Sequence, residues 1–312
     1  MVENKDNSFL VPKKNPSRLS KFLVSGFGKT PGDIVFNAVT YIFFLFLFFL
    51  CLYPFIYVLL ESLKLVDTSG GQVTTHYGLD AYFLVFQNDS LFSSLLFSIV
   101  VTLISTLFSV ILTVLCAYPL TRPALKGRNA FLLFIVFAML FSGGFIPFYF
   151  LITETLNLGG NPLVYIVIGL VSPYNIIIVK NFIKGIPEEI MESARVDGAS
   201  EIRTLFSIIL PLSGPIIATI ALWVAVGKWN DWMTTLYYMQ DTDKSFWMFQ
   251  YYLQEILNTA SSDNPNPDKD IVALAENVRN SAVIISVLPI IIVYPFVQKY
   301  FVKGVLLGSV KG

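Results

Sequence analysis

Residues 34–60 read IVFNAVTYIFFLFLFFLCLYPFIYVLL, an apolar run of 27 residues that contains no charged side chain. A helix that crosses a bilayer needs about 20 such residues, so the run is long enough to span. A secretory signal has an apolar core of only about 7–15 residues, and no small-residue cleavage site follows this run. We therefore expect a membrane anchor that stays in the mature protein.

Five further apolar segments follow along the chain. Hydrophobic residues make up 55% of the 312 residues, charged residues make up 13%, and the mean hydropathy is +0.68. Soluble domains contain about 25% charged residues, so this composition is typical of a membrane protein. The net charge is zero, which gives no indication of a nucleic-acid partner. We predict an all-α integral membrane protein with six transmembrane helices, at residues 34–60, 91–120, 130–151, 163–179, 205–226 and 282–301.

Lysine and arginine are distributed unevenly between the connections. Cytoplasmic loops of membrane proteins carry an excess of these residues. Of the 21 in the chain, 16 fall on the side that holds both termini. We therefore predict a multi-pass protein with both termini in the cytoplasm. The five on the opposite side are Lys64, Lys228, Lys244, Lys269 and Arg279.

Two of the predicted spans contain helix breakers. Gly143, Gly144 and Pro147 fall in the outer part of the third span. We expect that helix to stop there and residues 148–158 to lie along the outer surface. In the fourth span, residues 172–175 (SPYN) fall near mid-depth, where a polar patch must face protein or water.

The connection before the fifth span contains ESARVDGASEIRTLFSIILP, residues 192–211. Pro187, followed by two glutamates, favours the first turn of a short helix. Gly198 is a suitable C-terminal stop, and Ser200 can cap a second helix that continues into the fifth span. An exposed elbow of small residues can enter a groove on another protein, although a helix that only anchors the connection is an alternative. The small residues at the elbow are Ser193, Ala194, Gly198 and Ala199.

The same residues resemble the coupling signature of permease subunits in binding-protein-dependent ABC importers. In that family a Glu-small-Ala opening is followed by Asp-Gly-Ala and, after a helical run, by a proline. This sequence departs from the pattern at Ser193, where a second alanine is usual. The matching positions are Glu192, Ser193, Ala194, Asp197, Gly198, Ala199 and Pro211.

Other segments resemble the carbohydrate-uptake branch of this family. Residues 227–232, GKWNDW, resemble its Trp-Asn element, and residues 294–312 resemble the tail of the second maltose permease subunit. The glycines and proline of the third span resemble the group that handles larger or less common oligosaccharides. The resemblance covers residues 34–312.

The resemblance implies a domain organisation. It predicts the type I ABC importer permease fold with a cytoplasmic coupling helix over residues 32–312, preceded by a cytoplasmic arm at residues 1–31. Within the domain, residues 181–211 would form the coupling loop and residues 228–280 an outer excursion.

The resemblance also implies a transport subunit of the bacterial cytoplasmic membrane rather than an enzyme. Its partners would be a second homologous permease subunit, two cytoplasmic ATPase subunits and an extracellular solute-binding protein. ATP and Mg would bind to the ATPase subunits, and this chain would hold no cofactor or metal. The cargo would be a sugar or an oligosaccharide.

Candidates for contact with such a cargo lie in the fourth span and outside the fifth. Sugars present hydroxyls to amide groups and polarised C–H faces to aromatic rings. Alternatively, the amide only satisfies a hydrogen bond between helices, and the tryptophans belong to an interfacial belt. The sequence leaves both interpretations open. The candidates are Tyr174, Asn175, Trp229, Asn230, Asp231 and Trp232.

Residues 26–30, GFGKT, contain the Gly-Lys-Thr of a nucleotide-binding loop. That loop also needs a glycine five residues before Gly28, where this chain has Leu23. It needs a following helix in a soluble α/β domain, whereas Pro31 and a membrane span follow here. We therefore expect ATP hydrolysis on another chain.

Three alternative functions make different demands on the sequence. A secondary transporter driven by an ion gradient would need intramembrane carboxylates or paired half-helices, and the six predicted spans are nearly free of Asp and Glu. A membrane-embedded enzyme would need convergent His, Asp or Glu, whereas the single histidine, His76, falls in a polar loop. An ABC importer for a non-sugar solute stays open.

Overall fold

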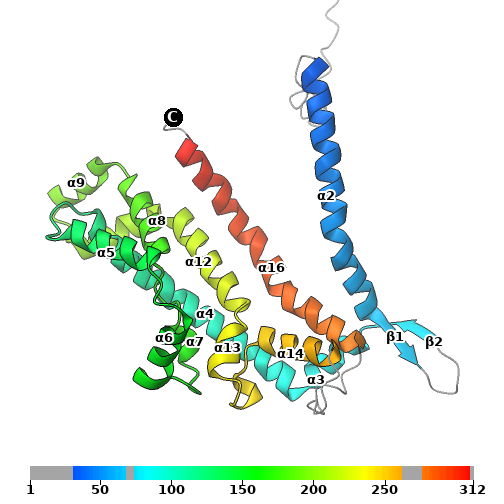
Figure 1. Ribbon diagram of the computed structural model, residues 1–312. Helices are drawn as coiled ribbons and strands as arrows, with labels where there is room; N and C mark the ends of the chain where they lie inside the picture. The colour runs from blue at the N-terminus through cyan, green and yellow to red at the C-terminus, as the bar shows by residue number, and fades with distance from the viewer. Residues whose placement is uncertain (1–30, 68–73, 262–275, 310–312) are drawn as a thin grey trace, which may run out of the picture. The chain divides into compact units, whose positions relative to one another are not determined.

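The computed structural model describes residues 31–67, 74–261 and 276–309 (Figure 1). The chain divides into two compact units, residues 1–58 and 59–312. The predicted N-terminal arm lies almost entirely outside the described residues, and so does the GFGKT run within it.

The first unit contains most of α2, Pro31–Leu63, which corresponds to the first predicted span. The helix begins at Pro31, where the missing N–H of proline costs no hydrogen bond. A second proline, Pro54, lies in the helix interior and removes one hydrogen bond there.

Among the described residues, three helical stretches are long and apolar enough to cross a membrane, and two bent helix pairs raise the number to five if each pair is one span. The structure is predominantly helical, as predicted, with one two-stranded hairpin, whereas six continuous spans are not found. The third and fifth predicted spans are the two bent pairs, and the fourth is broken into short pieces. The three stretches are Pro31–Leu63, Asp89–Thr121 and Asn277–Phe296, and the pairs are Arg128–Leu140 with Phe145–Thr155 and Glu201–Leu212 with Gly214–Trp229.

The second unit begins with a hairpin after α2. Strands β1, Lys64–Asp67, and β2, Thr74–Tyr77, pair antiparallel, with Leu65 opposite His76. His76 is exposed, as predicted, but it lies in a strand rather than in a loop.

The helices that follow correspond to the second span. α4 begins where the Asn88 side chain accepts a hydrogen bond from the Leu91 N–H at 2.9 Å, which satisfies a free donor of the first turn. The elements are α3, Asp80–Gln87, α4, Asp89–Ala117, and the 3-10 turn η1, Pro119–Thr121.

The third span is broken at the predicted glycines. The helix axis turns by 111° between α5 and the helix that follows, and Gly144 takes the left-handed φ of +85° that the turn requires. The elements are α5, Arg128–Leu140, α6, Phe145–Phe150, and the π-helical turn η2, Leu151–Thr155.

The fourth span is broken at the predicted polar patch. A single turn, α7, Val164–Val167, is followed by non-helical residues that include Gly169 at φ +71°. The longer helix α8, Pro173–Lys184, then begins with Ser172 as its cap. The break exposes backbone carbonyls that a continuous helix would have paired.

The fifth span is bent, which corrects the prediction of a helix continuous with the coupling elbow. The axis turns by 79° at Ser213, between α11, Leu210–Leu212, and α12, Gly214–Trp229. Pro211 and Pro215 flank the bend, and neither has an N–H to donate to a continuous helix.

The predicted outer excursion packs on the rest of the unit wherever it is described. Phe249 and Tyr252 are fully buried in a cluster with residues of α3, α4 and α16. These described residues of the excursion therefore belong to the core of the second unit. Its elements are α13, Met233–Tyr238, η4, Lys244–Phe246, and α14, Phe249–Ser261, after which α16, Glu276–Ser309, ends the described chain.

The buried face of α4 is a line of small hydroxyl residues. They recur every three or four residues, which places them on one face of the helix. Side chains this small let neighbouring helices, α12 above all, approach closely. The buried residues of this face are Ser94, Ser98, Thr102, Ser105, Ser109 and Thr113.

Candidate functional site

The elbow before the fifth span is formed as the sequence predicts. α9, Glu188–Val196, follows Pro187 and ends at Gly198, which has φ +75°. The Gly198 N–H donates to the Arg195 carbonyl at 3.0 Å, and the Ala199 N–H donates to the Ala194 carbonyl at 2.9 Å. This pair of bonds is the Schellman motif, which closes a helix with a glycine in the left-handed conformation.

The second helix of the elbow starts immediately after the turn. The Ser200 hydroxyl accepts a hydrogen bond from the Arg203 N–H at 3.3 Å, which confirms Ser200 as the cap. α10, Glu201–Thr204, continues into the π-helical turn η3, Leu205–Ile209.

The predicted coupling residues do not all face outward. Ala194 is buried, with 6% of its surface exposed, so its small size serves packing within the chain. Two apolar side chains that the sequence analysis did not single out are strongly exposed instead, Val196 at 87% and Ile202 at 71%. A hydropathy pattern that reads the elbow as a polar connection misses them. The exposed coupling residues are Glu192, Ser193, Asp197 and Gly198, and Ala199 is half-buried.

A polar cluster joins the elbow to the end of α4. Arg122, which is 9% exposed, lies 3.1 Å from the Glu201 carboxylate. The same carboxylate accepts from the Tyr118 hydroxyl at 2.6 Å and lies 3.3 Å from Arg195. Arg122 also donates to the Met191 sulfur at 2.8 Å, and its guanidinium lies 4.5 Å from the centre of the Tyr118 ring. Movement of either elbow helix therefore acts on the end of α4.

Basic residues gather at this end of the second unit. Figure 1 shows α5 and α9 at one end of α4 and α13 and α14 at the other. Partial burial lowers the pKa of Lys180, and the nearby positive charges of Lys184 and Arg128 lower it further. These three residues come from two connections that the sequence assigns to the same side of the membrane.

A cavity of about 400 Å³ lies between the broken fourth span and α12. Its volume falls within the roughly 300–1,000 Å³ typical of small-molecule sites. Of the predicted substrate residues, it brings together Asn175, which is 7% exposed, and Asp231. Tyr174 stacks on Trp223 at the cavity, with 6.2 Å between the ring centres.

The other predicted substrate residues do not line this cavity. Trp229 is buried, and its indole N–H donates to the Ser286 carbonyl of α16 at 2.8 Å. Trp232 packs against the same core, and Asn230 donates to the Val226 carbonyl of its own helix. Among the described residues, these three side chains therefore have structural partners.

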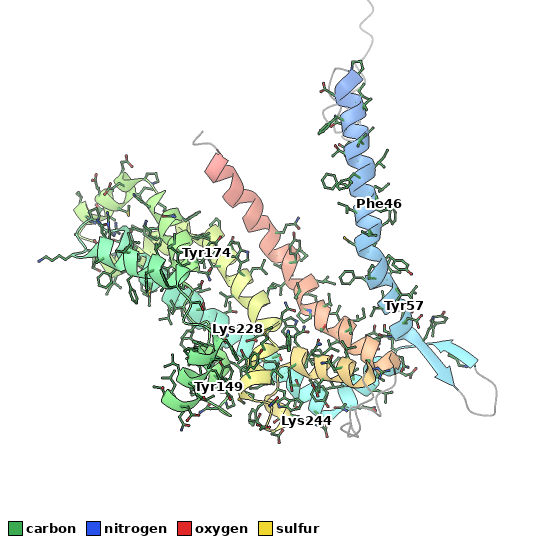
Figure 2. The ribbon with its side chains drawn as sticks, in the orientation of Figure 1. Phe46, Tyr57, Tyr149, Tyr174, Lys228 and Lys244 are labelled. Carbon is green, nitrogen blue, oxygen red and sulfur yellow. The ribbon has the colours of Figure 1, made fainter. Side chains whose placement is uncertain are left out.

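Lys228 is the cavity residue that the sequence analysis missed as a substrate candidate. It lies in the last turn of α12, is 8% exposed, and donates to the carbonyls of Tyr165 and Ile168, each at 2.6 Å. Figure 2 labels Lys228 on α12 and Tyr174 on α8. In the sequence, a lysine that follows an apolar span looks like a loop residue. Its buried position depends on the helix break after α7, which leaves the carbonyls of Tyr165 and Ile168 free to accept its hydrogen bonds.

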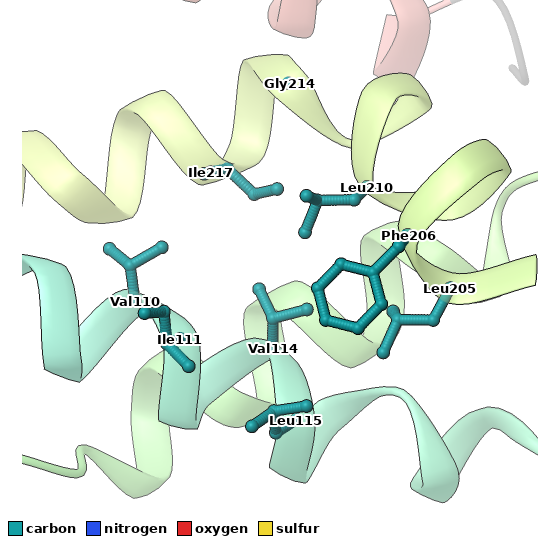
Figure 3. Close-up of a pocket in the computed structure, with 9 residues that line it drawn as sticks. All are labelled: Val110, Ile111, Val114, Leu115, Leu205, Phe206, Leu210, Gly214 and Ile217. Carbon is teal, nitrogen blue, oxygen red and sulfur yellow. The ribbon is translucent and has the colours of Figure 1, made fainter. Parts of the chain in front are cut away.

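A second cavity, of about 310 Å³, has a hydrocarbon lining and offers no polar side chain to a sugar. Figure 3 shows its side chains converging from α4, η3, α11 and α12. It adjoins the elbow and is a gap between bent helices rather than a polar binding site. Its lining consists of Val110, Ile111, Val114, Leu115, Leu205, Phe206, Leu210, Gly214 and Ile217.

Comparison with known proteins gives consistent matches over most of the chain. Residues 22–307 match the family described as the inner membrane component of binding-protein-dependent transport systems. The Bacillus subtilis polygalacturonan/rhamnogalacturonan transport system permease protein YtcP is 38% identical over 89% of this chain and 99% of its own. Protein LplC of the same organism is 38% identical over 83% of this chain and 89% of its own. A chain of a bacterial ABC transporter that imports the acidic polysaccharide alginate superposes with a TM-score of 0.76 at 27% identity, covering 88% of this chain and 99% of that one.

Proposed function

The chain belongs to the family of inner membrane components of binding-protein-dependent transport systems, as the permease of an ABC importer for a sugar or oligosaccharide, and we propose that its elbow couples import to separate ATPase subunits. The observation that carries this proposal is the geometry of the elbow. Glu192, Val196, Gly198 and Ile202 are exposed on α9, the closed turn and α10, and the Arg122–Glu201 ion pair attaches this elbow to the end of α4. A braced, exposed and partly apolar turn is suited to docking in a groove of another subunit.

The remaining partners follow from the same proposal. A second homologous permease subunit would complete the translocation path, two ATPase subunits would bind ATP and Mg, and an extracellular solute-binding protein would deliver the cargo. YtcP is a permease for polygalacturonan or rhamnogalacturonan, and the similar bacterial transporter imports alginate, so both relatives act on polysaccharides, which supports an oligosaccharide as the cargo. The cavity at Asn175 and Trp223 offers an amide and an aromatic ring to sugar hydroxyls and C–H faces.

Purified alone, this chain should hydrolyse no ATP. Coexpressed with its partner subunits, it should form an assembly whose ATP hydrolysis rises when the sugar-loaded binding protein is added. Phosphate release by the two preparations in nanodiscs measures the difference. Hydrolysis by the isolated chain, lost on Lys29→Ala, would refute the assignment of the ATPase to another subunit.

The proposed orientation places the elbow in the cytoplasm and the β-hairpin outside. In a background with Cys51→Ser and Cys116→Ser, a membrane-impermeant maleimide added to intact cells should label His76→Cys and leave Ser200→Cys unlabelled. Both positions are exposed, so labelling after the cells are opened checks that each is reactive. The reverse pattern in intact cells would invert the topology.

A further inference from the structure

The buried Lys228 ammonium carries a charge that its partners only partly balance. Burying an ammonium ion is costly unless an opposite charge pairs with it. Its partners are two neutral carbonyls, of Tyr165 and Ile168. Within the described part of the chain, no carboxylate lies within 4.0 Å of its nitrogen.

The acidic residue nearest in sequence is engaged elsewhere. Asp231 lines the same cavity, but its carboxylate accepts from the Thr234 N–H at 3.0 Å and from the Thr234 hydroxyl at 2.6 Å. These bonds fix Asp231 at the start of α13. Its charge lowers the net positive potential of the cavity without forming an ion pair with Lys228.

The ammonium has one donor left over. A lysine ammonium has three N–H groups, and the two carbonyls use two of them. Lys228 also lines the cavity, where Asn175 and Trp223 offer an amide and an aromatic face. An unpaired N–H, an amide and an aromatic ring around one space of about 400 Å³ form a complete set for a sugar ring that bears a carboxylate.

From this geometry we propose that the cavity between the broken fourth span and α12 is a subsite for an acidic sugar, whose carboxylate pairs with Lys228. The inference rests on the proposed import of an oligosaccharide and names its chemical class. Gly169, at φ +71°, takes the left-handed conformation that favours glycine at the helix break, and a Cβ there would make an ordinary contact with the Lys228 nitrogen at 4.0 Å. The helix break and the lysine thus belong to one site.

The test compares two probes on the transporter assembled with its partner subunits in nanodiscs, without the binding protein. The probes are α-1,4-linked digalacturonate and its carboxyl-reduced, neutral counterpart, and equilibrium dialysis gives each Kd. The wild-type assembly should bind the acidic disaccharide at least tenfold more tightly than the neutral one. If the wild-type assembly binds both probes equally, or binds neither, that measurement alone overturns the proposal.

Variants then assign the preference to the lysine. Lys228→Met should bring the two Kd values within twofold of each other, and Lys228→Arg, which keeps the charge, should retain the preference. Lys184→Met removes a lysine from an exposed position on α8 and should change nothing. A preference for the acidic probe that survives Lys228→Met refutes the subsite.

Failure of the subsite differs from failure of the proposed function. If deletion of this chain leaves cellular uptake of oligosaccharides unchanged, the import function is wrong. If uptake is lost on deletion and the Kd values show no preference for the acidic probe, only the subsite is wrong.

Discussion

Gly198→Trp should abolish uptake while leaving the amount of protein in the membrane unchanged. Gly198 has φ +75°, a conformation that costs a residue with a side chain about 1–2 kcal/mol. Apart from its chain neighbours, no atom of the described residues lies within 4 Å of the position that a Cβ would occupy, so a side chain at this position starts out in open space. The loss would therefore come from the partner surface that closes around the turn. Uptake of labelled oligosaccharide and copurification of the ATPase subunit measure it.

Smaller substitutions at Gly198 separate the effect of backbone strain from the effect of side-chain volume. Asparagine tolerates the left-handed conformation, so Gly198→Asn should keep most of the uptake, and Gly198→Ala should show the strain with little added volume. Gly143→Trp is a control at another open, exposed glycine, in the break of the third span and away from the elbow. Wild-type uptake and copurification in Gly198→Trp would return the elbow to a role as a membrane anchor.

Arg122→Gln should uncouple hydrolysis from import and lower the uptake per ATP hydrolysed at least tenfold. Arg122 forms an ion pair with the Glu201 carboxylate at 3.1 Å, and glutamine loses the charge that faces Glu201. The docking face of the elbow stays in place because its turn is closed by backbone bonds. The ATPase should therefore still copurify and hydrolyse ATP while α4 no longer follows the elbow.

A charge exchange gives the sharper test of that pair. Glu201→Arg alone should be defective, and Arg122→Glu with Glu201→Arg should recover part of the uptake, which a double-mutant cycle expresses as a coupling energy. Arg203→Gln is the matched control, because this arginine is exposed beside Glu201. Additive effects of the two single changes would show that the pair does not transmit the motion.

The elements that local chemistry controls could be predicted from the sequence. The Schellman turn at Gly198, the cap at Ser200 and the breaks at Gly144 and Ser172 each depend on residues within a few positions. The family resemblance of residues 192–211 also led to the correct class of transporter, because coupling constrains residue type and spacing together.

The features that depend on distant partners could not be predicted. Pro211 and Pro215 mark a break near Ser213, but the 79° bend and the packing of α12 on α4 do not follow from them, because hydropathy does not distinguish a bent apolar segment from a straight one. Lys228 reads as the first residue of an outer loop until the carbonyls of Tyr165 and Ile168 are placed beside it. Arg122 and Glu201 lie 79 positions apart, so nothing in either local sequence indicates their contact.

The hydroxyl face of α4 has a mechanical consequence. Near its start, the hydroxyls of Ser94 and Ser98 form hydrogen bonds with the backbone of Trp247 and Phe249. Farther along, the hydroxyls of Thr102, Ser105, Ser109 and Thr113 find no hydrogen-bond partner in the described chain. Close contact without directional bonds resists separation but offers little resistance to sliding. We therefore expect the start of α4 to stay attached to residues 247–249 when α12 shifts along the rest of the helix, because the four unbonded hydroxyls have no side-chain hydrogen bond to break.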